Sequence, residues 1–153
     1  MATTLTVDNF NFGAGLIYDR HVNSSAAIDA DKMQHAYEKG TNFATAIGGT
    51  PATREEIIHI ASQAGTIRNF KARLADTGTS TDIDFDLEVN GVSVLSAAVN
   101  ITHSDSDGTT KSGTISSASF SAGDVITLVM TVTSSTGAQG AYAQVAFEEN
   151  TAP

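Results

Sequence analysis

The sequence contains no cysteine among its 153 residues. This absence excludes disulfide bonds, zinc sites built from thiolates, and cysteine nucleophiles. The sequence also has no apolar run of about 18 residues, the length from which a membrane-spanning helix is built. Its first residues do not combine a basic, an apolar and a small-residue segment, as a secretory signal does. We therefore expect neither a membrane partner nor a signal peptide.

Basic residues are few: 8 lysines and arginines stand against 17 aspartates and glutamates, so the net charge is −9. The basic residues are scattered and do not cluster in sequence. Binding to nucleic acid depends on a concentration of lysine and arginine against the phosphates, so we expect no nucleic acid partner. The length corresponds to one domain, which would bury roughly 68–70% of the surface of its unfolded chain.

The most regular pattern in the chain lies between Thr81 and Val89. Apolar and acidic residues alternate there without exception, which is typical of a strand with one buried face. Asn90-Gly91 follows directly, and this dipeptide is the strongest short-range signal for a two-residue β-hairpin turn. The predicted core set is Ile83, Phe85, Leu87 and Val89, and the predicted outer set is Asp82, Asp84, Asp86 and Glu88.

Further strand signals recur at intervals of about 8–12 residues from Arg54 onward, separated by turns rich in Gly, Asn, Asp and Ser. The expected strands are 56–62, 65–75, 81–89, 92–95, 98–103, 113–117, 125–132 and 140–148. This spacing predicts an all-β fold, a jelly roll or β-sandwich of about eight antiparallel strands. We assign it to residues 51–153 and treat residues 1–50 as an N-terminal extended arm.

The arm has weaker patterns. A short helix is predicted over Asp29–Lys39, because Met33 and Tyr37 share a face, an aspartate can cap its start and Gly40 can end it. The arm either lies on the sandwich or reaches a neighbouring subunit. The residues expected at such an interface are Leu5, Val7, Phe10, Phe12, Leu16 and Tyr18.

The acidic residues of 81–89 raise the question of a metal or catalytic site. Alternate residues of a strand lie about 6.6–6.8 Å apart, whereas calcium needs six to eight oxygens at about 2.3–2.6 Å. Spacing therefore favours a solvated outer face with partners on the next strand. If residues 76–80 connect a hairpin, its register pairs Arg73 with Asp82, Lys71 with Asp84, Phe70 with Phe85 and Ala72 with Ile83.

Other candidate sites are weaker. Residues 104–108 (Ser-Asp-Ser-Asp-Gly) have the composition of a calcium loop but not its twelve-residue spacing or terminal glutamate, so a hairpin turn is expected. The four histidines are dispersed, with His59 expected at a surface or interface, and no Gly-x-Ser-x-Gly elbow occurs. We predict no enzyme activity, no cofactor and no metal site. Three tyrosines, Tyr18, Tyr37 and Tyr142, could line a sugar site or pack in the core.

Two groups of segments have a family resemblance. The first is Gly65-Thr66-Ile67 with Ile83–Leu87 and Asn90–Ser96, and the second is Gly113-Thr114-Ile115 with Phe120–Leu128. Together they resemble the jelly-roll domains of structural proteins of tailed bacteriophages, including capsid decoration (cement) proteins, over about residues 54–148.

The resemblance implies a homotrimeric virion protein on the outer capsid surface, with the major capsid protein as its partner and no catalytic or ligand residues. Such domains also occur in phage fibres and bacterial surface proteins. A fibre or another glycan-binding or receptor-binding β-sandwich is therefore the alternative, and a calcium-dependent adhesive module is a third.

Overall fold

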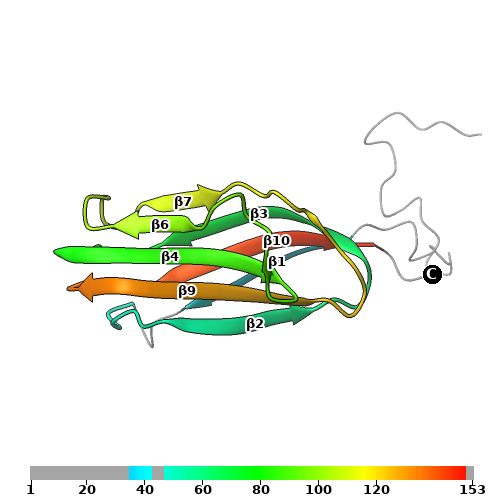
Figure 1. Ribbon diagram of the computed structural model, residues 1–153, viewed down its shortest axis with the longest axis horizontal. Coiled ribbons are helices and arrows are strands. Elements are labelled where there is room, and N and C mark those ends of the chain that lie inside the picture. Colours follow the sequence, from blue (N-terminus) through cyan, green and yellow to red (C-terminus); the bar gives the residue numbers. More distant parts are fainter. Residues whose placement is uncertain (1–34, 43–46, 151–153) are drawn as a thin grey trace, which may run out of the picture.

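The computed structural model describes the backbone of residues 35–42 and all of residues 47–150. Within them, ten strands form two antiparallel sheets (Figure 1). Their bounds are β1 His35–Asn42, β2 Arg54–Ile60, β3 Gly65–Arg73, β4 Ser80–Val89, β5 Val92–Ser93, β6 Val99–Thr102, β7 Thr110–Gly113, β8 Ser119–Phe120, β9 Val125–Thr136 and β10 Tyr142–Glu149. The predicted all-β sandwich is confirmed.

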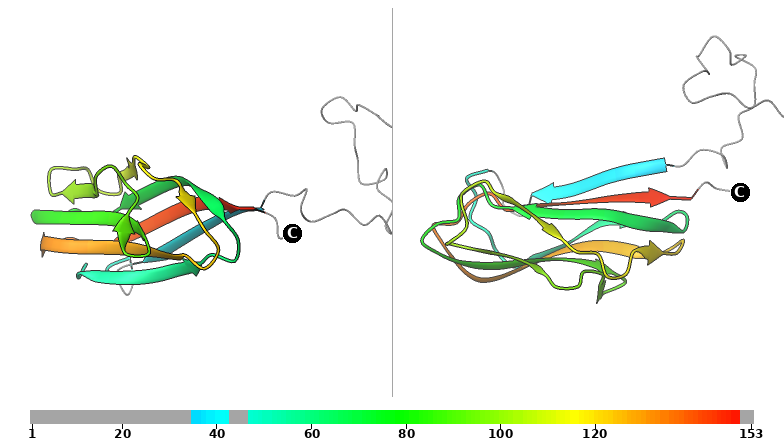
Figure 2. Two further views of the ribbon diagram at one scale, coloured as in Figure 1. Left: turned by 45° about the vertical axis from the view of Figure 1, so that its right-hand side comes forward. Right: turned by 90° about the horizontal axis from the view of Figure 1, so that it is seen from above.

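Strand pairing is nested from the outside of the sequence inward. β1 pairs with β10 and β2 with β9, while β3 pairs with β7 and β8, and β4 with β5 and β6. Sheet A therefore has the order β1-β10-β3-β7 with β8 beside β3, and sheet B has the order β2-β9-β4-β5 with β6 beside β4. A long hairpin rolled into two layers gives this order, so the sandwich is a jelly roll. Figure 2 shows the two layers edge-on.

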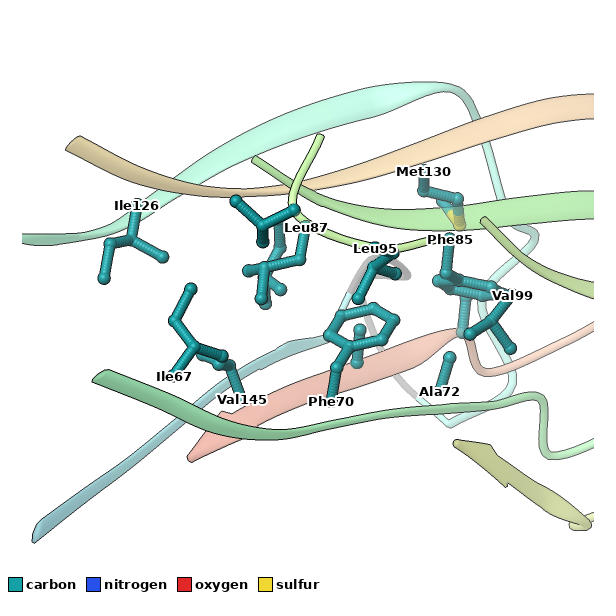
Figure 3. Close-up of a cluster of buried hydrophobic side chains, with 14 of the residues drawn as sticks. Ile67, Phe70, Ala72, Phe85, Leu87, Leu95, Val99, Ile126, Met130 and Val145 are labelled. Carbon is teal, nitrogen blue, oxygen red and sulfur yellow. The ribbon is translucent and has the colours of Figure 1, made fainter. Parts of the chain in front are cut away.

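The core lies between the sheets and is built by period-two alternation. Ile83, Phe85 and Leu87 of β4 are fully buried, as predicted, and Val89 packs against the same cluster while partly buried. Phe70 on β3 points into the core from the opposite sheet (Figure 3). Burying each such large apolar side chain contributes about 1.5–3 kcal/mol before entropy is counted, so these alternating segments dominate the stability of the sandwich.

The Asn90-Gly91 hairpin is confirmed. It joins β4 to β5, with Glu88 opposite Ser93 and Val89 opposite Val92. Asn90 has φ 52° and Gly91 has φ 76°. Positive φ at both central residues defines a type I′ turn, whose twist matches the strands it joins. An asparagine and a glycine occupy this conformation with little strain.

The predicted helix over Asp29–Lys39 is wrong in the part that the structure describes. Residues 35–42 form β1, an antiparallel strand whose eight residues pair with β10 from Glu149 to Tyr142. Residues 29–34 lie outside the described residues. The helix was predicted from one apolar pair and two end signals, which is a weak local preference. Pairing along the whole length of β10 overrides such a preference.

The predicted β3–β4 hairpin is also wrong. The two strands are consecutive but lie in different sheets, so Lys71 and Asp84 face opposite sides of the molecule. Arg73 pairs instead with Tyr142 and Thr110. The connecting residues cross between the layers, with Leu74 and Thr77 buried. Phe70 and Phe85 face each other across the core rather than along one sheet.

Strand limits differ from the expectation in two places. The strand expected at 113–117 is wrong: β7 ends at Gly113, and Ile115 forms an isolated bridge with Leu95. The strand expected to end at residue 132 is β9, which continues to Thr136. In β2 a bulge between Ile57 and His59 interrupts the alternation. As a result Ile60 is 63% exposed, while His59 turns toward sheet A.

Candidate binding groove and charged faces

The residues predicted to form a subunit interface, Leu5, Val7, Phe10, Phe12, Leu16 and Tyr18, lie outside the described residues. That interface stays a prediction. The described residues present four other features: a basic groove on sheet A, an acidic face on sheet B, a buried polar cluster between the sheets, and an edge strand with exposed isoleucines.

The groove lies on the outer face of sheet A. Because alternate residues of a strand face opposite sides, the inward positions of β3 and β10 leave Lys71, Arg73, Tyr142 and Gln144 pointing outward. Their register places Tyr142 opposite Arg73 and Gln144 opposite Lys71. Thr110 of β7 and Ile47 complete the walls of a groove of about 610 Å³.

The groove is positively charged. In the part of the chain that the structure describes, neither Lys71 nor Arg73 forms an ion pair. The nearest acidic residue of the same sheet face along β10, Glu148, forms an ion pair with Arg68 at the other end of β3. Two basic side chains therefore face solvent beside an aromatic ring and an amide. This combination suits an anionic ligand with hydroxyl groups.

The outer face of sheet B is acidic. Asp82, Asp84, Asp86 and Glu88 all point outward from β4, as the alternation predicted. The amide of Asn100 donates to Asp82 and to Asp84, at 2.7 and 2.8 Å, in place of the lysine and arginine that the hairpin predicted. Burial, followed by the charges of Asp86 and Glu55, raises the pKa of Glu88. Like charges therefore crowd this face.

The hairpin turn predicted at residues 104–108 is wrong, because these residues lie in a loop that connects β6 of sheet B to β7 of sheet A. Acidic side chains hold this loop in place. Asp105 accepts hydrogen bonds from the backbone N–H of Thr102 and from Lys111 Nζ, at 2.9 and 2.7 Å. Asp107 accepts from the backbone N–H and the hydroxyl of Thr77, at 2.8 and 2.9 Å. These donors lower the pKa of both carboxyls, that of Asp105 mainly through Lys111 and that of Asp107 mainly through the Thr77 N–H. The carboxylates thus hold the loop to its neighbours. Within the described residues no group of three His, Asp or Glu is arranged to hold a metal ion.

A buried polar cluster joins the two sheets. Glu149, at the end of β10, is 4% exposed and accepts three hydrogen bonds: from His59 Nε2 at 2.9 Å, and from Ser62 N and Oγ at 2.9 and 3.0 Å. The His59 ring lies against Phe147, with centroids 4.7 Å apart. Burial raises the pKa of Glu149, but the hydrogen bonds from His59 and Ser62 outweigh it, so the pKa is lowered.

The chemistry of this cluster is structural. Ser62 donates its hydroxyl hydrogen to the carboxylate, and the imidazole binds the other carboxylate oxygen. A serine nucleophile would instead give its hydrogen to the imidazole. The sequence signal was present but missed: Ala143, Val145 and Phe147 are buried, and continuing their alternation places Glu149 inward.

The edge strand of sheet B has exposed isoleucines beside charged residues, among them the Arg54–Glu56 ion pair. β2 lies at the end of this sheet, and two of its isoleucines, Ile57 and Ile60, are 66% and 63% exposed. An edge strand offers unpaired backbone groups, and natural proteins usually protect it with charges or cover it. Exposed isoleucines on an edge are therefore a candidate contact for another chain. No helix of the described residues is long and apolar enough to span a membrane.

No protein-family model matches the sequence, and no curated protein matches it either. Among solved structures, a chain in "Structure of infectious bursal disease virus Gt strain" is similar at a TM-score of 0.28 and 10% sequence identity. The match covers 78% of this chain and 37% of that chain. The protein thus spans less than half the length of that neighbour, and a similarity this low carries no argument about function.

Proposed function

We propose that this protein is a virion structural protein, a capsid decoration (cement) protein that binds the outside of a phage head and stabilises it. The observation that carries the proposal is the fold formed by β1 to β10. The segments that resemble the jelly-roll domains of phage structural proteins lie in one eight-strand jelly roll with two short additional strands. The proposed partners are the major capsid protein and further copies of this chain, in a homotrimer.

Charge supports an external position. A protein with net charge −9 is repelled by packaged DNA, whose phosphates carry one negative charge per about 1.7 Å of duplex. A protein inside the shell would need basic surface against that DNA. Of the 8 basic residues, two, Lys71 and Arg73, line the groove on sheet A.

The edge strand β2 supports subunit contacts. A neighbouring chain that pairs with β2 would satisfy its backbone groups and cover Ile57 and Ile60. The predicted arm, residues 1–50, would supply chain for such a contact from its residues outside β1. We therefore propose that decoration combines the arm with this edge.

The test measures occupancy of heads of the encoding phage, purified without this protein and then mixed with it. We expect saturable binding, loss of binding when residues 1–20 are deleted, and weaker binding for Ile60→Lys. Val92→Lys is the matched control, because Val92 is similarly exposed, at 67%, on β5 at the far side of sheet B. Unchanged occupancy after the deletion would refute the role of the arm. Absence of the protein from purified virions would refute decoration.

The second candidate is a fibre or receptor module that binds glycans. One observation favours it, the groove that holds Tyr142 beside two basic residues. Binding on a glycan array that Tyr142→Ala abolishes, together with failure to bind heads, would favour this candidate over decoration.

A further inference from the structure

We infer that the groove on sheet A is a binding site for a saccharide that carries a carboxylate, such as a uronic or sialic acid residue. This inference goes beyond decoration, because it concerns a different surface from the arm and the β2 edge, and it deepens the glycan-binding candidate by naming the class of sugar. It rests on the arrangement of four side chains on two neighbouring strands.

The four side chains form a compact platform. Lys71 and Arg73 are two residues apart on β3, so their stems are about 6.4–6.8 Å apart. Gln144 and Tyr142 stand directly across from them on β10, where cross-strand neighbours have Cβ atoms about 4.5–5.5 Å apart. One sugar ring spans a platform of this size. The groove volume of about 610 Å³ leaves room for a second ring and lies within the usual range of small-molecule sites, about 300–1,000 Å³.

Each side chain has a matching part on such a ligand. The guanidinium of Arg73 can bind a carboxylate through two parallel hydrogen bonds, and Lys71 adds a second positive charge. The ring of Tyr142, 37% exposed, offers an apolar face to the C–H side of a sugar. The hydroxyl of Thr110 and the amide of Gln144 can exchange hydrogen bonds with sugar hydroxyls.

The strand positions argue against a peptide. An extended peptide usually gains affinity by adding a strand to a sheet edge. β3 lies between β10 and β7, and β10 lies between β1 and β3, so the backbone at the floor of the groove is already paired. A ligand here must be recognised through side chains alone. That condition suits a saccharide, which has no strand to contribute.

The charge distribution argues against nucleic acid and for a small anion. Two basic residues on a chain of net charge −9 are too few to hold a phosphate backbone. The acidic outer face belongs to sheet B, on the other side of the molecule. The groove therefore keeps a local positive potential for one carboxylate.

The test uses the full chain and two matched probe pairs, sialyllactose against lactose and a glucuronic acid disaccharide against its neutral glucose counterpart. Binding is followed by calorimetry and by amide chemical shifts in NMR spectra. We expect at least one acidic probe to bind and its neutral counterpart to bind at least about tenfold more weakly, with affinity falling as salt rises. Arg73→Ala should weaken binding about 10- to 100-fold, and Tyr142→Ala should weaken it while Tyr142→Phe retains it.

Arg68→Ala is the control, because Arg68 lies on the same strand but outside the groove and is paired with Glu148. It should change the affinity by less than about twofold, the scale of an exposed ion pair. Thermal unfolding of every variant shows whether it is folded, and the conservative Tyr142→Phe and Arg73→Lys variants replace any that is not. The inference is overturned if no acidic probe binds at about 10 mM, or if neutral sugars bind equally well. It is also overturned if Arg68→Ala weakens binding as much as Arg73→Ala, or if an acidic peptide shifts the groove amides at lower concentration than the acidic sugars.

Discussion

Substituting Glu149 with alanine removes a buried carboxylate that accepts hydrogen bonds from two residues at the end of β2 and just beyond it. Three hydrogen bonds are lost, from His59 Nε2, Ser62 N and Ser62 Oγ. Hydrogen bonds to a charged group contribute about 1.5–3 kcal/mol each, but donors that regain water recover part of this. Ser62 is exposed, so its two donors are rehydrated. We therefore expect a loss of about 2–4 kcal/mol in the free energy of unfolding, and a melting temperature lower by about 5–15 °C.

Urea unfolding followed by far-UV circular dichroism measures this loss. An unchanged slope of the unfolding free energy against urea concentration shows that the variant still unfolds cooperatively. The matched control is Glu148→Ala, one residue earlier on β10. Glu148 forms an ion pair with Arg68 in which both side chains are partly exposed, 24% and 53%, and such a pair contributes about 0–1 kcal/mol. Equal losses for the two variants, or a loss below about 0.5 kcal/mol for Glu149→Ala, would refute the role of the buried cluster.

The same cluster predicts a dependence on pH. Because the pKa of Glu149 is lowered from its ordinary value of 4.5, its contribution to stability is present above pH 4.5 and is lost as pH falls through the lower, folded-state pKa. The stability difference between the unmodified protein and Glu149→Gln should therefore be largest near neutral pH and shrink below about pH 4. A difference that stays constant from pH 7 to pH 3 would contradict this assignment.

Three further predictions concern the core, a turn and the acidic face. Leu87→Ala, at a fully buried position of β4, should cost about 2–5 kcal/mol in urea unfolding. Gly140→Ala should lower the melting temperature more than Gly123→Ala, although both glycines have positive φ. A Cβ at residue 140 would lie 2.4 Å from the Ile47 carbonyl oxygen, whereas one at residue 123 meets no atom within 4 Å. Equal effects of the two substitutions would contradict the packing argument. Glu88→Gln should raise the melting temperature slightly at low salt and not at about 1 M salt, because it relieves repulsion from Asp86 and Glu55 that salt screens.

Local sequence patterns predicted which side chains of a strand face the core, because alternation within a single strand decides this. The alternation of 81–89 identified the buried residues of β4, and Asn90-Gly91 identified the turn that follows. Each of these two signals can be recognised from a stretch of about ten consecutive residues. Burial of one face imposes period two wherever a strand lies on a core, whichever strand is its neighbour.

The choice of neighbour could not be predicted in the same way. A jelly roll pairs β1 with β10 and leaves the consecutive strands β3 and β4 in different sheets. The opposite charges of Arg73 and Asp82 suggested a hairpin, but such pairs contribute only about 0.2–1 kcal/mol. Placing Leu74 and Thr77 in the interior and covering both sheets outweighs that gain. The same competition turned residues 35–39 from a weak helix into an edge strand.

The candidate sites were harder to predict than the fold, because each joins residues that are distant in sequence. His59 and Glu149 are 90 residues apart. The alternation of β10 places Glu149 inward, but no local pattern pairs it with His59. The groove depends on the register between β3 and β10, since a shift of one residue would turn Tyr142 and Gln144 into the core. Lys71 and Arg73 already lie two residues apart on β3, and the register places Tyr142 and Gln144 beside them.

Separation of charge between the two sheet faces constrains how this protein can dock. Covering the outer face of sheet B would strip water from Asp82, Asp84, Asp86 and Glu88. Burial, followed by the charges of Asp86 and Glu55, already raises the pKa of Glu88. That desolvation costs several kcal/mol per ion unless the partner supplies cations in good geometry. The outer face of sheet A carries Lys71 and Arg73, which form no ion pair within the described part of the chain. An acidic ligand that binds there would pair with these cations and would not have to desolvate carboxylates. We therefore expect sheet B to face solvent in any assembly with an acidic surface, with β2 at its edge as the protein contact and the groove of sheet A left open to a ligand.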